Sequence, residues 1–199
     1  MKVIGVTGGV GAGKSQILEY LRHKTACRVI MADQVAHKLE EPGAACYDQI
    51  IALLGDTILA ADGRIDKGKM AARIFEDQDM LVRINGIVHP AVKTYLLEAI
   101  NQEKQAGKLQ YLFIEAALLI EDGYGQIVDE MWYVHADEKI RRERLKKSRH
   151  YSDDKINQIM QGQLSEEMFY RYCSVVIENE GTLESVYRQI EEKLGEDLC

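Results

Sequence analysis

The chain has 199 residues, of which 46% are hydrophobic and 29% are charged, and its formal net charge is −7. This length suits one globular domain with its own core, and the acidic balance argues against a broad nucleic-acid surface, which needs clustered basic residues. The sequence holds no apolar run long enough to cross a membrane and opens on a strand rather than a signal peptide, so we expect a cytoplasmic protein.

The first predicted elements are a strand, a glycine-rich loop and a helix. Lys2 to Thr7 is a short β-branched run, and Ile17, Leu18 and Leu21 recur at helical spacing. Between them, residues 8–15 read GGVGAGKS and fit the phosphate-loop pattern G-x-x-x-x-G-K-[ST] at every fixed position. The strand before the motif and the helix after it are the context that this pattern requires.

The chemistry of this loop explains its fixed residues. Glycines allow positive φ angles, so that backbone N–H groups and the start of the next helix can surround a phosphate. Lys14 can reach the β- and γ-phosphates, and the Ser15 hydroxyl can bind Mg²⁺. We therefore predict a site for ATP with Mg²⁺, formed by Gly9, Val10, Gly11, Ala12, Gly13, Lys14, Ser15 and Gln16. A chance glycine turn is the alternative; a dinucleotide site is disfavoured because it gives Lys14 and Ser15 no role.

A second strand is predicted over Arg28 to Ala32, and Asp33 follows it before a helical stretch. A carboxylate at this edge of the sheet can orient an acceptor hydroxyl toward the γ-phosphate. The alternative is that Asp33 is the N-cap of the next helix, and spacing alone leaves both open. Pro42-Gly43 interrupts the helical stretch, and another helix begins near Ala44.

The segment from about 56 to 107 shows no convincing strand. Ala61-Asp62-Gly63 indicates a turn, and an apolar series at three- and four-residue steps then predicts one long amphipathic helix or a broken pair. The members of that series are Leu81, Ile84, Val88, Val92, Tyr95 and Ala99. Because Pro90 falls inside it, we expect a kink or a boundary near His89. We interpret the segment as a helical insertion on the α/β core.

The remainder returns to alternating strands and helices. Strands are predicted over Tyr111 to Glu115, Met131 to His135 and Val175 to Ile177; a basic helix over Asp137 to Lys147, a polar stretch from Ser148 to about Arg171, and a last helix over Thr182 to Leu194. This alternation predicts an α/β fold with a parallel sheet. We expect a single three-layer P-loop NTPase domain over 1–199, with the insertion at about 56–107 and a lid at about 141–172.

The lid would supply positive charge to the phosphates. Its arginines are Arg141, Arg142, Arg144 and Arg149, and guanidiniums can stabilise a transferring phosphoryl group. The alternative is a solvated basic helix face.

The cysteines Cys27, Cys46, Cys173 and Cys199 form no C-x-x-C pair and show no metal-ligand spacing, so we expect reduced, partly buried thiols.

A phosphate loop alone also occurs in GTPases, motors and helicases. We find no D-x-x-G or N-K-x-D motif in a suitable context, and a helicase would need more length and a basic surface. A kinase needs an acceptor site, a residue to orient the acceptor hydroxyl and an arginine lid, and each has a candidate here.

Taken together, the motifs make the chain resemble bacterial dephospho-coenzyme A kinases over essentially its whole length. The resemblance rests on the order and spacing of Gly5 to Ser15, Ala32-Asp33, Val35-Ala36-His37, Glu41-Pro42-Gly43, Ala61 to Lys67, Ile74-Phe75, Val88-His89-Pro90, Leu118 to Glu121 and Val176 to Gly181. It implies ATP-dependent phosphorylation of the ribose 3′-hydroxyl of dephospho-coenzyme A, the last step of coenzyme A synthesis.

The resemblance also implies roles for individual residues. Asp33 matches the catalytic aspartate beside the acceptor hydroxyl, Arg142 the lid arginine that approaches the phosphates, and Asn179 an asparagine that borders the adenine. His89 lies in a motif associated with the acceptor, although a structural histidine is an equal alternative. Lys67 and Leu118 complete the predicted acceptor site.

Four positions depart from the family pattern. Glu115 stands where an aspartate is frequent, Ala117 where a proline is usual, and Lys67 and Gln158 where arginines are common. Lysine cannot make the bidentate phosphate contacts of arginine. Two extra residues also fall near Tyr151, and Gln163 keeps a glutamine of the pattern.

The predicted partners are ATP and dephospho-coenzyme A, with no nucleic acid or membrane, in a monomer or weak homo-oligomer. Two alternative functions stay open: another small-molecule kinase acting on a nucleoside, nucleotide or shikimate-like alcohol, and an ATP-binding switch protein without transfer activity.

Overall fold

The computed structural model describes residues 1–24 and 26–195, and Cys199 lies outside them. The chain divides into two compact units. The first unit combines Met1–Ile30 with Glu103–Cys199, and the second is Met31–Gln102. The predicted insertion at 56–107 falls mostly within the second unit.

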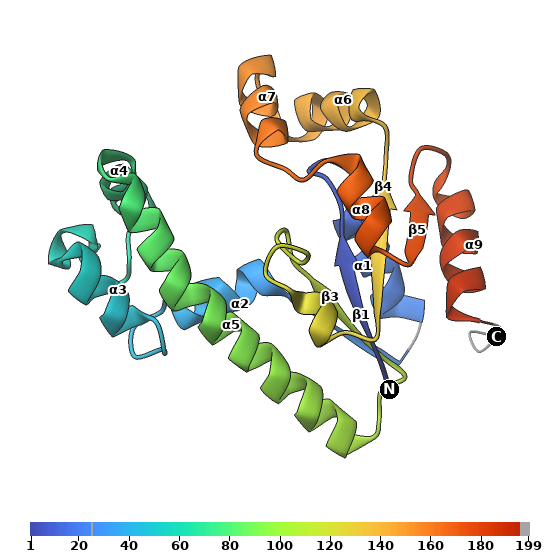
Figure 1. Ribbon diagram of the computed structural model, residues 1–199, viewed down its shortest axis with the longest axis horizontal. Helices are drawn as coiled ribbons and strands as arrows, with labels where there is room; N and C mark the ends of the chain where they lie inside the picture. Colours follow the sequence, from blue (N-terminus) through green and yellow to red (C-terminus); the bar gives the residue numbers. More distant parts are fainter. Residues whose placement is uncertain (25, 196–199) are drawn as a thin grey trace. The chain divides into compact units, whose positions relative to one another are not determined.

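The first unit is built on a five-stranded sheet in the order β2-β3-β1-β4-β5 (Figure 1). Its strands are β1 (Lys2–Thr7), β2 (Cys27–Met31), β3 (Tyr111–Glu115), β4 (Glu130–His135) and β5 (Val175–Glu178). The pairs of β1 with β3, β1 with β4, and β4 with β5 are all parallel. The register pairs Val6 with Glu115 and Thr7 with Tyr133, so these strands end at one edge of the sheet. The predicted parallel α/β fold is confirmed.

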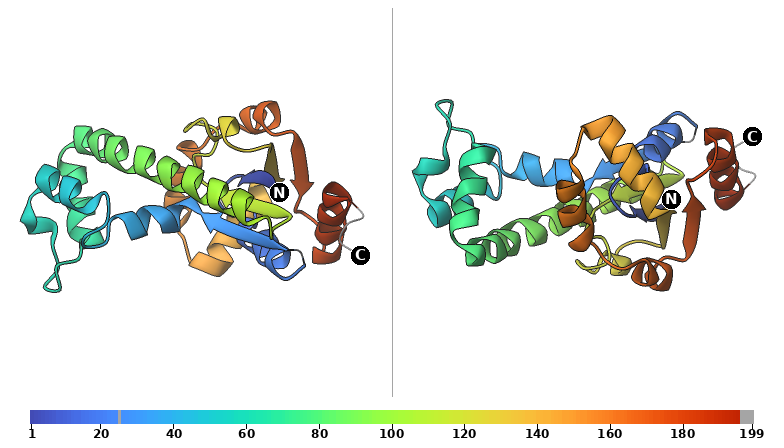
Figure 2. Two further views of the ribbon diagram at one scale, coloured as in Figure 1. Left: turned by 90° about the horizontal axis from the view of Figure 1, so that it is seen from below. Right: turned by 90° about the horizontal axis from the view of Figure 1, so that it is seen from above.

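Helices cover both faces of this sheet. Alternate strand residues, among them Val6, Phe113 and Trp132, pack in one core with buried residues of α1 (Lys14–Lys24) and α9 (Leu183–Leu194). On the opposite face, Tyr133 stacks on Phe169 of α8 (Glu166–Tyr172) with ring centroids 4.7 Å apart. This alternation is the two-residue period of a strand buried on both sides, and Figure 2 shows the helices that flank the sheet.

Two helices of the first unit lie where we predicted only a polar stretch. After α6 (Glu138–Arg149) come α7 (Asp153–Gln161) and α8. Ser152 is the N-cap of α7, where its side chain accepts a hydrogen bond from the amide of Lys155, and Ser165 is the N-cap of α8. Serine followed by two acidic residues is typical of a helix start, so the sequence did carry this pattern.

The second unit is helical. It contains α2 (Ala32–Leu39), α3 (Tyr47–Leu54), the 3₁₀ turn η1 (Asp56–Ile58), α4 (Lys67–Glu76) and most of α5 (Gln78–Ala106). The predicted turn at residues 61–63 lies beside an isolated antiparallel bridge between Leu59 and Ile65.

Of the kink or boundary expected near His89, the boundary is wrong, because α5 continues through Pro90. Its apolar face is buried on both sides of the proline, at Ile84, Val88 and Val92. Tertiary burial along the whole face therefore stabilises a helix that proline weakens only locally.

Within the part of the chain that the structure describes, no helix has both the length and the apolar character to span a lipid bilayer.

Candidate active site

The phosphate loop joins the end of β1 to the start of α1. Gly11 and Gly13 have φ angles of 81° and 94°, in the region that favours glycine. The amide of Ala12 donates to the Gly9 carbonyl over 3.1 Å, and that of Gln16 donates to the Gly13 carbonyl over 3.1 Å. The expected positive φ angles are confirmed, and the loop runs directly into the helix N-terminus.

The Lys14 side chain lies between the start of this loop and the end of β3. Its Nζ donates to the Gly8 carbonyl over 2.7 Å and is 3.8 Å from Oε1 of Glu115. Glu115 ends β3 and is only 7% exposed. A carboxylate buried this deeply is stabilised by a nearby cation. The pairing with Glu115 therefore holds the Lys14 ammonium group at the loop.

Oxygen ligands suited to Mg²⁺ come from the same residues. Ser15 is exposed in the first turn of α1, and Glu115 offers a carboxylate at the adjacent strand end. Magnesium prefers hydroxyl and carboxylate oxygens and keeps several waters. These residues therefore fit the ion that accompanies ATP.

Asn179 fastens the other end of the loop. It follows β5, is 3% exposed, and its Nδ2 donates to the Ala12 carbonyl over 2.7 Å. Arg144 of α6 donates to the carbonyls of Asn179, over 2.8 Å, and Ala12, over 3.4 Å. A Cβ at Gly13 would lie 2.2 Å from Nδ2 of Asn179, so only glycine permits this approach.

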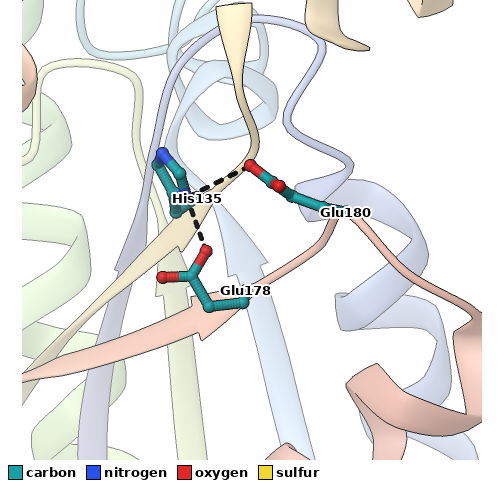
Figure 3. Close-up of side chains that lie close together, drawn as sticks. All are labelled: His135, Glu178 and Glu180. Atoms are coloured by element: carbon teal, nitrogen blue, oxygen red, sulfur yellow. Dashed lines mark hydrogen bonds and ion pairs between the residues drawn. The ribbon is translucent and has the colours of Figure 1, made fainter.

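The segment that carries Asn179 is held by a histidine and glutamates (Figure 3). Nδ1 of His135 lies 2.5 Å from Oε2 of Glu178 and 3.7 Å from Oε1 of Glu180, and Nε2 lies 3.0 Å from Oε1 of Glu166. The ligand atoms of His135, Glu178 and Glu180 lie within 4.8 Å of one another, as in a metal site. The pairing of both ring nitrogens with carboxylates accounts for the cluster without an ion. The His135 carbonyl also accepts from the amide of Asn179 over 2.8 Å.

The four arginines predicted for a lid have different surroundings. Arg141 and Arg144 lie at the phosphate loop, where Nη1 of Arg141 would be 2.1 Å from a Cβ at Gly9. Arg142 donates instead to Glu138 and Asn157, each over 2.7 Å. Arg149 lies 6.0 Å from the ring centre of Tyr151.

The helical period indicates why the neighbours differ. Leu145 is the buried apolar residue of α6, and Arg141 lies one turn before it on the same face. Arg142, the next residue, lies about 100° from Arg141 around the helix axis. The helical period alone does not select Arg141 and Arg144, because Arg141 and Arg142 both lie within one turn of Leu145 and Arg144 lies about 100° from it. Their contacts with the loop separate them from Arg142.

The predicted acceptor residues fall in both units. In the second unit, Asp33 is exposed in the first turn of α2, Lys67 is the exposed first residue of α4, and His89 is half-buried within α5. The N-cap of α2 is Met31, so the alternative that Asp33 caps this helix is wrong. In the first unit, Leu118 follows β3 and is 40% exposed.

Comparison with known proteins identifies relatives along nearly the whole chain. The family described as dephospho-CoA kinase matches residues 2–185. The dephospho-CoA kinase of Streptococcus pyogenes serotype M3 is 32% identical over 192 residues, covering 96% of both chains. The crystal structure of TT1252 from Thermus thermophilus is 26% identical, with a TM-score of 0.80 and coverage of 98% and 97%. The dephospho-CoA kinase from Campylobacter jejuni shares the fold, with 19% identity, a TM-score of 0.71 and coverage of 95% and 94%.

Proposed function

Because the chain belongs to the dephospho-CoA kinase family, we propose that its site transfers the terminal phosphoryl group of ATP to the ribose 3′-hydroxyl of dephospho-CoA. The products are CoA and ADP. The observation that carries the proposal is the position of Lys14, which lies between the Gly8 carbonyl and the buried carboxylate of Glu115 at the loop. This is where a cation is required to bind the β- and γ-phosphates.

The nucleotide binds through the loop from Gly9 to Gln16. Backbone amides and the N-terminus of α1 surround the phosphates, and Ser15 holds Mg²⁺. When bound, that ion neutralises charge that develops on the phosphate oxygens. Asn179 borders the adenine, a role supported by its contact with Ala12 at the end of the loop nearest α1.

The acceptor binds through Asp33, Lys67, His89 and Leu118. Asp33 accepts a hydrogen bond from the 3′-hydroxyl and directs the hydroxyl oxygen at the γ-phosphorus. As this oxygen bonds to phosphorus, Asp33 takes the hydroxyl proton, and the bond between phosphorus and the leaving ADP oxygen breaks. The exposure of Asp33, together with Met31 as the helix cap, supports this role, because the carboxylate has no capping function.

The lid covers the phosphates and excludes water, so that transfer outcompetes hydrolysis. The family resemblance assigns the phosphate contact to Arg142. That assignment requires Arg142 to leave Glu138 and Asn157, its partners in the structure.

The protein is proposed to act in the cytoplasm as a monomer or weak homo-oligomer. An acceptor panel tests its reaction. ADP release is measured with Mg²⁺·ATP and, in turn, dephospho-CoA, shikimate, a nucleoside and a nucleoside monophosphate. Release that depends on dephospho-CoA supports the proposal. Release that depends on another alcohol would assign the chain to a different acceptor, and ATP binding without release with any of them would favour a switch protein.

A further inference from the structure

Two neighbouring arginines of α6 have opposite environments. Arg141 donates through Nε to the Ala136 carbonyl over 3.1 Å and through Nη1 to Oε1 of Gln163 over 3.4 Å. Both of these acceptors are uncharged. Arg142 forms an ion pair with Glu138 at 2.7 Å. The charge of Arg142 is thus paired with a carboxylate, whereas neither of these acceptors compensates the charge of Arg141.

Arg141 is also fitted closely to the loop. The Cβ of any residue other than glycine at position 9 would lie 2.1 Å from Nη1 and 2.9 Å from Cζ of Arg141. At position 11 the Cβ would lie 2.9 Å from the Arg141 carbonyl oxygen. Gly9 and Gly11 therefore let this residue approach the loop backbone, which sets the guanidinium beside the amides that bind phosphate.

The side-chain oxygen of Gln163 occupies the position between these donors. Oε1 accepts from the amide of Val10 over 3.3 Å and from Nη1 of Arg141 over 3.4 Å. An oxygen that accepts from a loop amide and from a guanidinium has the surroundings of a phosphate oxygen. Both bonds are long for N–H···O bonds, and both are made to a neutral acceptor, so an anionic oxygen would replace Gln163 favourably.

There is space beside this oxygen. A cavity of about 500 Å³ is lined by Gly9 of the loop and by residues of β4, α6 and the α7–α8 segment. Arg141 and Gln163 line it, as do the carboxylates of Asp137, Glu138 and Glu166. It lies at the Gly9–Val10 end of the loop, whereas Asn179 and Arg144 lie at the Ala12–Gly13 end. If the adenine lies beside Asn179, as proposed above, the Gly9–Val10 end receives the terminal phosphate.

We propose that Arg141, not Arg142, is the arginine that contacts the terminal phosphate of ATP, and that Gln163 occupies the position of a phosphate oxygen until ATP displaces it. The inference rests on the proposed ATP site and adds to it a specific cation and an internal competitor. On binding, the terminal phosphate takes over the hydrogen bonds of Val10 and Arg141, and the Gln163 side chain moves into the adjoining cavity.

Calorimetric titration with Mg²⁺·ATP and Mg²⁺·ADP, without acceptor, tests this assignment. A hydrogen bond to a charged group corresponds to about a 10- to 100-fold change in affinity. Arg141→Gln should weaken ATP binding by about that factor and ADP binding much less. Lys147→Gln on the same helix removes the same charge at an exposed position and should leave both affinities within about twofold. A larger ATP-specific loss in Arg142→Gln than in Arg141→Gln, or equal losses of ATP and ADP in Arg141→Gln, would overturn the assignment.

Substitutions of Gln163 test the competitor independently. Gln163→Glu keeps the shape but places a carboxylate beside Arg141, so ATP should bind at least about tenfold more weakly. Gln163→Ala removes the competitor and should bind ATP as tightly as the wild type or more tightly. Weaker ATP binding in Gln163→Ala would show that Gln163 assists the nucleotide, and would overturn its role as a competitor. Thermal melting confirms that each variant is folded, and Arg141→Lys retains the charge if Arg141→Gln is unstable.

These titrations are separate from the proposed reaction. If the wild type binds ATP but forms no CoA, the proposed function fails while the contrast between Arg141 and Arg142 still decides this inference. If the wild type binds no ATP, both fail.

Discussion

Asn179 offers a quantitative test of how the phosphate loop is held. Its buried Nδ2 donates to the Ala12 carbonyl over 2.7 Å, and its own carbonyl accepts from Arg144 over 2.8 Å. Asn179→Ala removes only the first of these bonds and leaves a buried carbonyl with the 3.4 Å contact to Arg144. Because that remaining contact is long for a hydrogen bond, the carbonyl is left poorly satisfied, and an unsatisfied buried acceptor costs about 1–3 kcal/mol.

In a chain of this size, that loss corresponds to a fall in Tm of about 2–12 °C. The assay is thermal unfolding with and without Mg²⁺·ATP. A ligand that binds only the folded state raises Tm according to its affinity. The Tm of Asn179→Ala should therefore rise less on adding Mg²⁺·ATP than the Tm of the wild type does.

Asn101→Ala is the matched control, since Asn101 is exposed within α5 and its substitution should change stability by less than about 0.5 kcal/mol. If the Tm of Asn179→Ala lies within about 1 °C of the wild-type Tm and rises equally on adding ATP, the anchoring role is refuted.

Further predictions concern the transfer step and the thiols. Lys14→Ala and Asp33→Ala should each lower turnover at least about a hundredfold in an ADP-release assay; near-normal turnover in Asp33→Ala would deny it a catalytic role. Chelation of Mg²⁺ with EDTA should abolish transfer, and added Mg²⁺ should restore it. Burial raises the pKa of the Cys173 thiol to about 12, so its reactive thiolate is scarce below that pH. In the folded protein, mass-resolved alkylation at pH 8 should leave Cys173 unmodified, whereas urea-unfolded protein should react; rapid native alkylation would contradict its burial.

Much of the first unit could be predicted from the sequence because its strands are short apolar runs followed by polar or glycine residues. The loop pattern fixed the position of β1 and α1, and the strands near residues 28, 111, 131 and 175 were confirmed to within a few residues. Parallel pairing followed from the alternation of strands with helices.

Other features depend on tertiary contacts. Pro90 lies within a helix because the apolar face of α5 is buried on both sides of it, and a residue-by-residue propensity cannot include that burial. The helices α7 and α8 were marked in the sequence by their serine caps and by short apolar sets, Ile156, Ile159 and Met160 in α7 and Met168 and Phe169 in α8.

The choice among the arginines of the predicted lid also depends on tertiary contacts. A resemblance to a family pattern selects Arg142, whereas the contacts with Gly9 and Gln163 in the structure select Arg141. Which of two adjacent arginines faces the phosphates depends on a rotation of about 100° around the helix axis, and on glycines at positions 9 and 11 that permit the approach.

The most direct measurement for the account as a whole is the mass of the product. The protein is incubated with Mg²⁺·ATP and dephospho-CoA, and the coenzyme is analysed by mass spectrometry, with NMR to locate the added phosphate. The account predicts CoA phosphorylated at the ribose 3′-oxygen, formed together with ADP and lost in Lys14→Ala. Unchanged dephospho-CoA, or a phosphate on another oxygen, would contradict it.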